Sequence, residues 1–369
     1  MKTWDVIIVG AGIIGLSLAI SLRKQGLRVL VVERGEPGRE ASYAAAGMLA
    51  PAGLEIPSAL RRLAEASANL YPEFVHELED ESGMKVDFQE HGTIILSSDS
   101  QFPESAQALS PDELRSLEPC INAKRGSAEL AAAFMSERCV DPRLLVAAAL
   151  QAARHRNVDI SSGTEVKSVL IQGNCAIGVR TDRTSYSAGM VVNCAGAWSG
   201  TIAPHEFPVH PVKGQMLSVV HGPPLRHVLR TDEVYVVPRA DGRLIIGSTL
   251  EKVGYNKQVL VSTIKILLQA AVEVMPGLKG SREHEVWAGL RPGTPDDLPI
   301  VGVTSTPGYF VASGHYRDGI LLAPITAEVM TSLLLGRIPK ADLTAFAPSR
   351  FSQAGGYASL NARRNDQSE

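Results

Sequence analysis

The first 35 residues contain apolar runs separated by a segment with helical spacing. The run from Asp5 to Val9 is mostly apolar and β-branched, which predicts a short strand buried on both faces. Apolar positions recur at helical spacing from Ile13 to about Gln25, and Gly26 is a typical helix end. A second apolar run covers Leu27 to Val32. This pattern predicts a β–α–β unit with parallel strands.

The pattern changes in the second half of the chain. From His210 to Leu250, apolar and polar side chains alternate, which predicts antiparallel strands with one solvated face. The segment "RADGRL" (239–244) predicts a hairpin turn, and a helix is expected over residues 258–275. After residue 284 the strand–glycine–helix pattern returns. The chain is therefore expected to weave between a nucleotide-binding domain and an antiparallel domain.

The expected class is α/β (α+β) with two interleaved domains, because 369 residues exceed the ~100–200 residues of a usual domain. The segment 351–369 is polar, rich in small residues and expected to be disordered. We assign residues 1–82, 140–205 and 284–350 to the nucleotide-binding domain, and residues 83–139 and 206–283 to the antiparallel-sheet domain.

Charge and cysteine content exclude several kinds of partner. A formal net charge of −3 without any Lys/Arg run argues against nucleic acid and anionic membranes. No apolar stretch reaches the ~18 residues of a membrane span, so no integral membrane segment is expected. The four cysteines have neither CxxC nor metal-ligand spacing, which predicts free thiols, no metal site and a cytoplasmic protein.

Three glycines follow the first predicted strand in G-x-G-x-x-G register. Gly10 allows a tight turn, Gly12 leaves room for a pyrophosphate, and Gly15 lets the helix approach the sheet. Glu33 ends the second strand, where a carboxylate binds both ribose hydroxyls and disfavours the 2′-phosphate of NADP. NAD and FAD both fit this motif, and a glycine turn in an unrelated α/β domain is the simplest alternative. The small residues of "EASYAAAGMLAP" (40–51) leave room for a planar group, although a helix start explains them equally well.

Several further segments follow in a fixed order: "SYAAAGML", "VVNCAGAWSG", "VYVVPRADGRLIIGSTLE", "WAGLRPGTPDDLPIVG" and "GHYRDGILLAPITAEVM". In this order the chain resembles the D-amino-acid oxidase family of flavoproteins, with the glycine oxidases of bacterial thiamine biosynthesis as the nearest branch. The likeness covers Asp5 to about Phe346. It implies a glutathione-reductase-like Rossmann domain that binds FAD noncovalently, because neither "SYAAAGML" nor "GHYRDGILL" contains a cysteine that could tether the flavin. Glycine oxidases carry a histidine in the second of these loops without tethering the flavin.

The resemblance also implies which residues contact each part of FAD. Val166 is expected at the adenine, Glu33 and Arg34 at the adenosine ribose, and a helix N-terminus after Gly319 at the flavin ring. The expected cofactor-binding residues are Gly10, Gly12, Ile13, Ile14, Gly15, Glu33, Arg34, Ala41, Ser42, Ala46, Gly47, Met48, Val166, His315, Tyr316, Arg317, Asp318, Gly319, Ile320 and Leu321.

Three residues match substrate-binding positions of the family. Arg291 matches an arginine whose guanidinium fork binds the substrate carboxylate, Tyr235 matches a tyrosine that assists there, and Arg317 lies beside the flavin. Outside the motifs, a surface arginine and a half-buried packing tyrosine would be the plain alternatives. The family needs no acid or base residue, because hydride passes from the substrate Cα to flavin N5. Hydrolysis of the imine gives a keto acid (glyoxylate from glycine) and ammonia, and dioxygen yields hydrogen peroxide.

Two positions leave the substrate open. Glu233 and Leu250 stand where the glycine oxidases used for comparison have His and Met. Sarcosine, small D-amino acids and hydroxyproline therefore stay candidates beside glycine. A dehydrogenase that passes electrons to a quinone is the alternative function, and a non-catalytic flavin-binding protein is a third. A homo-oligomer is expected from the family.

Overall fold

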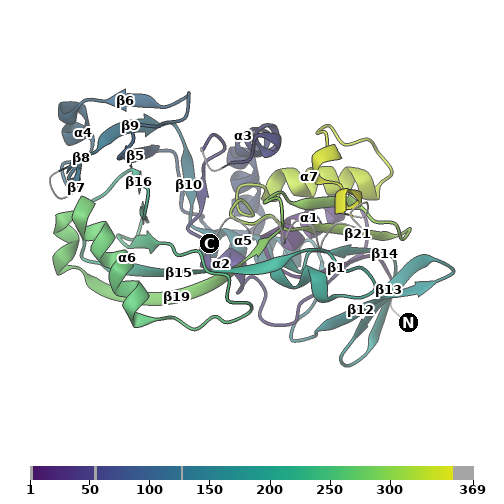
Figure 1. Cartoon of the computed structure of the whole chain (residues 1–369). Helices are drawn as coiled ribbons and strands as arrows, with labels where there is room; N and C mark the ends of the chain where they lie inside the picture. The colour runs from purple at the N-terminus through teal and green to yellow at the C-terminus, as the bar shows by residue number, and fades with distance from the viewer. Residues whose placement is uncertain (1–2, 54–55, 126–127, 352–369) are drawn as a thin grey trace, which may run out of the picture.

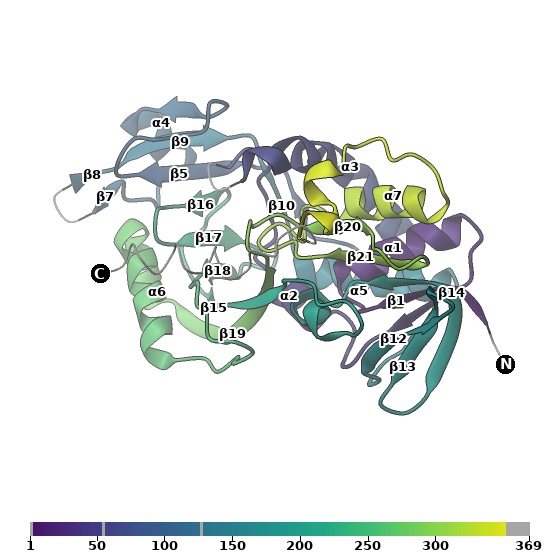
Figure 2. The same ribbon diagram turned by 45° about the vertical axis from the view of Figure 1, so that its right-hand side comes forward.

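The structure, a computed structural model, describes residues 3–53, 56–125 and 128–351. Two large sheets form two lobes, with α1, α7 and β14 in one and α6, β9 and β15 in the other (Figures 1 and 2). The segment predicted to be a disordered tail lies, from residue 352 onward, outside the described residues.

The first sheet is built on the predicted β–α–β unit. Its parallel strands follow the order β11–β2–β1–β14–β21, so strands from distant parts of the chain join the N-terminal unit. Val6 of β1 pairs with both Val29 of β2 and Met190 of β14. The elements are β1 (Trp4–Val9), α1 (Ile13–Lys24), β2 (Val29–Val32), β11 (Asp159–Ser161), β14 (Ser185–Asn193) and β21 (Tyr309–Ser313).

Antiparallel strands extend this sheet at two places. Strands β12 (Val166–Gln172) and β13 (Cys175–Thr181) form a meander with the start of β14. Strand β20 (Ile300–Val303) pairs antiparallel with β21. The first sheet is therefore mixed, with a parallel centre.

Four helices share one hydrophobic core with one face of the first sheet. Val6 and Ile8 of β1 belong to the core shared with the helices, whereas Ile7 and Val9 belong to a second core on the opposite face. This alternation follows from the two-residue period of a strand. Besides α1, the helices are α3 (Ser58–Ser82), α5 (Pro142–His155) and α7 (Ala323–Leu334), and α3 packs on α5 and α7.

The second sheet has the order β19–β15–β18–β17–β16–β5–β9–β6. All neighbours are antiparallel except β5 and β16, which are parallel. Helix α6 (Val261–Val274), predicted over residues 258–275, packs against it. The strands are β19 (Arg282–Gly293), β15 (His210–Val220), β18 (Leu244–Gly247), β17 (Tyr235–Pro238), β16 (Val228–Arg230), β5 (Thr93–Ser97), β9 (Ala131–Met135) and β6 (Gln107–Leu109).

Short elements complete the described chain. Helix α4 (Pro111–Leu117) carries a capping box between Ser110 and Glu113. The remaining elements are α2 (Ala41–Ala44), β3 (Met48–Leu49), β4 (Phe88–Gln89), β7 (Lys124–Arg125), β8 (Ala128–Glu129), β10 (Arg138–Val140) and the 3-10 helices Gly196–Thr201, Pro276–Gly280, Thr344–Phe346 and Pro348–Phe351.

The expected class, a Rossmann-type sheet beside a largely antiparallel sheet, is confirmed. The residue boundaries of the two domains stay a prediction. Strand β19 crosses one of them: it pairs along its length with β15 of the second sheet, although residues 284–350 were placed in the nucleotide-binding domain. The apolar–polar alternation of "VWAGL" is compatible with either sheet, so only the pairing places it.

Candidate active site

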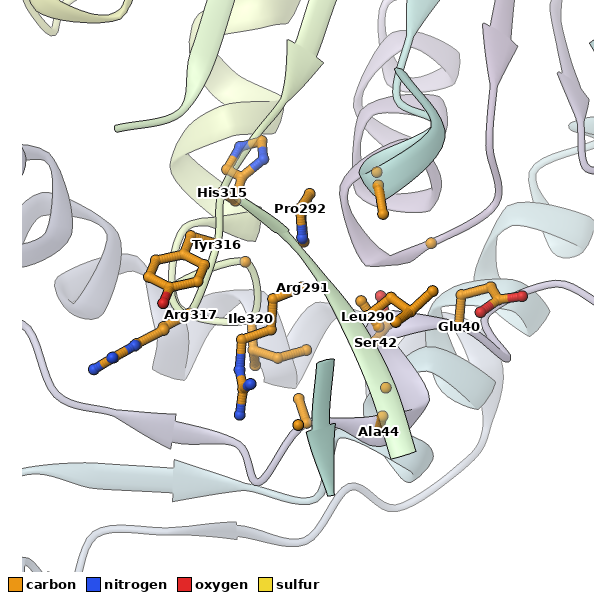
Figure 3. A pocket seen from close by; sticks show the side chains of 18 of the residues that line it. Glu40, Ser42, Ala44, Leu290, Arg291, Pro292, His315, Tyr316, Arg317 and Ile320 are labelled. Atoms are coloured by element: carbon orange, nitrogen blue, oxygen red, sulfur yellow. The ribbon is translucent and has the colours of Figure 1, made fainter. Parts of the chain in front are cut away.

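A cavity of about 470 Å3 connects the glycine turn of the first sheet with β17 and β19 of the second. Both sheets and the loops between them line it. In Figure 3 the side chains of Arg291, Tyr316 and Arg317 extend on one side of β19, with Ser42 and Glu40 toward the other. The predicted site residues all line this cavity except Gly15 and Leu321, which pack beside it. One cavity therefore holds both the expected dinucleotide residues and the expected substrate residues.

The glycine turn has the close contacts that its sequence predicts. Gly10 has φ +104°, and a Cβ atom there would lie 2.5 Å from the Cys194 carbonyl oxygen. A Cβ on Gly15 would overlap the Gly10 carbonyl. A Cβ on Gly12 would approach only the Ser42 hydroxyl, at 3.3 Å. The first two glycines are thus required by the protein itself, whereas Gly12 leaves space in front of α1.

The start of α1 offers backbone donors to an anion. The Ile13 amide donates to the Ser42 hydroxyl at 3.0 Å, and Gly12, the N-cap, has no side chain to cap the helix. Free amides and the positive end of the helix dipole suit a pyrophosphate. Glu33 is buried, and its carboxylate accepts from the amides of Ala11 (2.8 Å) and Gly35 (2.9 Å). Since an ionised carboxylate has about four acceptor positions, it can accept further bonds from ribose hydroxyls. The amide donors at the start of α1 and the acceptor carboxylate of Glu33 fit the pyrophosphate and the ribose of FAD.

Arg34 belongs to a polar and aromatic cluster at the same end of the cavity. Its guanidinium lies 3.4 Å from the centre of the Trp198 ring and 2.9 Å from the Glu40 carboxylate. Trp198 stacks on Tyr255, and Lys257 pairs with Glu40 at 2.9 Å. The loop between β18 and α6 thus closes against the nucleotide end of the site. We did not predict Trp198 as a site residue, although it lies within "VVNCAGAWSG", one of the segments that carry the family resemblance.

Hydrogen bonds to three of its carbonyl groups hold the loop over residues 41–48 in place. The Ala44 carbonyl accepts from the Trp287 indole (3.1 Å), the Ala46 carbonyl from Arg239 (2.6 Å) and the Gly47 carbonyl from the Val140 amide (2.9 Å). Gly47 has φ +81° and a Cβ there would lie 2.9 Å from the Pro142 ring. The loop is therefore fixed to its surroundings through its carbonyl groups.

The loop over residues 315–321 lines the opposite part of the cavity. His315 is 3% exposed, and its Nε2 lies 3.1 Å from the Thr326 hydroxyl. Burial lowers the pKa of His315 to about 3, so the imidazole is neutral near neutral pH. A helix N-terminus was expected after Gly319, and α7 begins at Ala323 after a turn. Pro324, near that start, favours the first turn of a helix.

Arg291 on β19 and Tyr235 on β17 line the cavity from the second sheet. Arg291 donates from Nη2 to the Ser248 hydroxyl (2.7 Å) and from Nη1 to the Thr249 carbonyl (3.2 Å), which fixes the guanidinium plane. Burial raises the pKa of Tyr235, while the nearby Arg291 acts in the opposite direction. The phenol therefore stays protonated near neutral pH and can donate. A guanidinium fork beside a phenol donor suits a carboxylate.

Glycines within strands make room for this pair, and the sequence analysis missed them. A Cβ on Gly214 would lie 2.7 Å from Cζ of Arg291, and one on Gly247 would lie 2.6 Å from the Tyr235 hydroxyl oxygen. A Cβ on Gly289 would overlap Cβ of Ala44 in the 41–48 loop. A glycine inside a strand often marks a close approach, so the signal was present in the sequence.

Glu233 and Leu250, the two positions that left the substrate open, also line the cavity, and both are exposed. Leu250 is 48% exposed and Glu233 lies in the turn before β17. Arg317 lies in the same cavity, with its guanidinium 5.2 Å from the centre of the Tyr316 ring. Within residues 3–53, 56–125 and 128–351, no group of three or more His, Cys, Asp or Glu side chains could hold a metal ion. None of the helices in these ranges is long and apolar enough to cross a bilayer.

Comparison with known proteins identifies the family of the chain. The model of the FAD-dependent oxidoreductase (DAO) family matches residues 5–333. The glycine oxidase of Pseudomonas aeruginosa is 34% identical over 359 residues, which cover 93% of this chain and 98% of that protein. The bifunctional protein ThiO/ThiG of Synechocystis is 36% identical over 364 residues, which cover 95% of this chain but only 54% of that protein.

The fold agrees as well. The crystal structure of glycine oxidase from Geobacillus kaustophilus superposes with a TM-score of 0.88 at 29% identity, covering 95% of this chain and 99% of that one. The chain spans about half the length of the ThiO/ThiG proteins and nearly the whole length of the single-function glycine oxidases. The chain therefore belongs to the family of FAD-dependent oxidoreductases, and FAD is its cofactor.

Proposed function

We propose that the protein oxidises glycine, or a similarly small amine such as sarcosine or a small D-amino acid, to an imine that hydrolyses to the keto acid and ammonia, or methylamine in the case of sarcosine. The observation that carries this proposal is the Arg291–Tyr235 pair at the end of the cavity away from the glycine turn. It offers a fixed cationic fork and a neutral phenol where a substrate carboxylate would bind. The name of the P. aeruginosa relative, glycine oxidase, supports the same substrate class.

The residues of this chain would act by orientation. Arg291, held by Ser248 and Thr249, would bind both carboxylate oxygens and so fix the direction of the Cα–N bond. Tyr235 would donate a further hydrogen bond to the carboxylate. Bound FAD supplies the hydride acceptor. The buried, neutral His315 is bonded to Thr326 and is not needed as a base. Holding the amine at a fixed distance from the flavin would be the main contribution of the protein to the reaction rate.

The oxidase and dehydrogenase alternatives differ in the electron acceptor. We propose dioxygen as the acceptor, a noncovalently bound flavin, a cytoplasmic location, a homo-oligomeric assembly and a role in thiamine biosynthesis, in line with the family resemblance. Glu233 and Leu250 line the cavity and are exposed, so they shape the entrance for a substrate larger than glycine.

The test is an assay of the purified holoenzyme in air with glycine, sarcosine, D-alanine, D-proline and hydroxyproline. Keto acid and hydrogen peroxide would be measured separately. Glyoxylate and peroxide in equal amounts from glycine or sarcosine would support the proposal. Turnover only with an added quinone would favour the dehydrogenase. No product from any of these amines under either condition would contradict the proposal.

A further inference from the structure

Arg239 contacts the 41–48 loop from inside the protein. It directly follows β17, its side chain is only 3% exposed, and Nη2 donates to the Ala46 carbonyl at 2.6 Å. Of the three donors that hold the carbonyls of residues 44, 46 and 47, it is the only charged one. A charge-assisted bond is about twice as strong as a neutral one, so Arg239 is the strongest of these three contacts.

Burial of the Arg239 guanidinium is costly in free energy, because its polar groups are only partly paired. Its Nε lies 3.6 Å from the Asp141 carboxylate, and Nη1 has no hydrogen-bond partner among the described residues. Asp141 is shared, because it also faces Arg243 at 3.4 Å and caps the N-terminus of α5 through the Arg143 amide. An arginine that served only to balance Asp141 would be redundant beside Arg243. Its distinct contact is the bond to Ala46.

Strand β17 connects this contact with the substrate end of the cavity. Tyr235 begins the strand and Arg239 follows four positions later, so both side chains point to the same face of the sheet. At about 3.3 Å per residue their Cα atoms are separated by roughly 13 Å. Strand β17 therefore carries Tyr235 at its start, and Arg239, which holds the 41–48 loop, directly follows its end.

We propose that Arg239 is a positioning residue that sets the distance between the flavin and the bound amine. It fixes the carbonyl of Ala46, and thereby the loop on which the flavin ring would rest, to the same strand that presents Tyr235. This inference rests on the proposed function, since it places the flavin against residues 46–48 and the amine at Arg291. Because the positive charge of Arg239 contacts this loop, we expect its loss to make the flavin potential more negative.

Two substitutions of Arg239 separate the effect of its bond to the loop from the effect of its positive charge. Arg239→Lys keeps the charge beside Asp141 but loses the fork that reaches Ala46, whereas Arg239→Ala loses both. Arg243→Ala is the matched control, because it also removes a partner of Asp141, and Arg243 forms its ion pairs with Asp141 and Asp241 rather than with the 41–48 loop. Each holoenzyme would be mixed anaerobically with glycine to obtain the limiting rate of flavin reduction and the Kd for glycine. The flavin midpoint potential would be measured with a dye and a chemical reductant, without any amine.

For Arg239→Lys we expect a limiting reduction rate at least tenfold lower, with a change in the glycine Kd below threefold and an unchanged potential. For Arg239→Ala we expect the same loss of rate and a more negative potential. Millimolar guanidinium should restore at least half of the lost rate in Arg239→Ala. Arg243→Ala should stay within twofold of the parent in rate and unchanged in potential.

Three results would overturn the inference. The limiting reduction rate of Arg239→Lys could equal that of the parent, or Arg243→Ala could lose as much of that rate as the Arg239 variants. The third is that the Arg239 variants bind glycine more weakly but reduce the flavin at the parent's limiting rate. If glycine did not reduce the parent enzyme at all, the proposed function would fail instead. The potential of Arg239→Ala would still test Arg239, because that measurement uses no amine. A potential equal to that of the parent would then contradict the inference.

Discussion

The guanidinium of Arg291 on β19 lies flat against the backbone of Gly214 on the neighbouring strand β15. A Cβ atom on Gly214 would lie 2.7 Å from Cζ of Arg291. The register places Val212 opposite Arg291, and Gly214 opposite Gly289. The arginine therefore reaches the cavity by crossing a neighbouring strand that has no side chain at the point of contact. Gly214 is as much a part of the expected carboxylate site as the arginine itself.

Gly214→Ala tests this packing relationship. The methyl group meets the flexible end of Arg291, so we expect the fold and the FAD spectrum to persist while the fork is displaced. Loss of one charge-assisted hydrogen bond, about 1.5 kcal/mol, corresponds to a roughly tenfold higher KM for glycine. Steady-state kinetics would measure it. Gly189→Ala, where no atom lies within 4 Å, is the control and should keep the parent KM. An unchanged KM in Gly214→Ala would refute the relationship.

Substitutions of Arg291 and of Tyr235 should raise the KM for glycine by different amounts. Arg291→Lys loses the fork, and we expect the KM for glycine to rise by about 10- to 100-fold, or about 1.5–3 kcal/mol. Tyr235→Phe loses one neutral donor, and about 0.5–1.5 kcal/mol predicts a rise of roughly 2- to 12-fold. Flavin absorbance should persist in both variants. A larger effect in Tyr235→Phe than in Arg291→Lys would contradict the assignment of the two roles.

Gly12→Ala should affect the cofactor rather than the fold. A Cβ on Gly12 would meet only the Ser42 hydroxyl, at 3.3 Å, but it would project into the space before α1. We expect the apoprotein to keep its melting temperature within a few degrees and to bind FAD at least tenfold more weakly, as measured by quenching of flavin fluorescence. Gly280→Ala, with open space around it, serves as the control. Equal FAD affinity in the two variants would show that the pyrophosphate lies elsewhere.

Acid should destabilise the protein through His315. Burial lowers its pKa from 6.5 to about 3, so below pH 6.5 the unfolded chain takes up a proton that the folded chain does not. The free energy of unfolding should therefore decrease as the pH falls from about 6.5 towards 3. This single group contributes up to about 1.4 kcal/mol per pH unit.

Denaturant unfolding of the holoprotein at several pH values between 7.5 and 4.5 would measure that slope. His315→Gln keeps a hydrogen-bonding group near Thr326 and should flatten it. His76→Gln, on the exposed surface of α3, should leave the slope as it is in the parent. Equal slopes in the parent and His315→Gln would mean that His315 titrates normally.

Local patterns in the sequence predicted the elements that depend on nearby residues. The glycine turn and α1 lie where the spacing of the glycines and of the apolar residues places them. Glu33 could be found because it ends the strand that follows that turn. These features are encoded within about 35 consecutive residues, so one stretch of sequence suffices to recognise them.

Features that depend on pairing between distant strands were not predicted. The alternating pattern of β19 does not say which sheet it joins, and the parallel pairing of β5 with β16 has no local signal. The role of Gly214 depends on the arrival of Arg291 from the neighbouring strand. The family resemblance predicted Arg291 and Tyr235, whereas the residues that hold them could be identified only from the three-dimensional structure.

The most direct test of the account is an anaerobic titration of the yellow holoenzyme with glycine, followed through the visible flavin absorbance and then by admission of air. The account predicts bleaching of the flavin by glycine, return of the colour in air with formation of hydrogen peroxide, and little bleaching of Arg291→Lys at the same glycine concentration. A flavin that stays oxidised with glycine, sarcosine and small D-amino acids, or an Arg291→Lys variant that bleaches as readily as the parent, would contradict it.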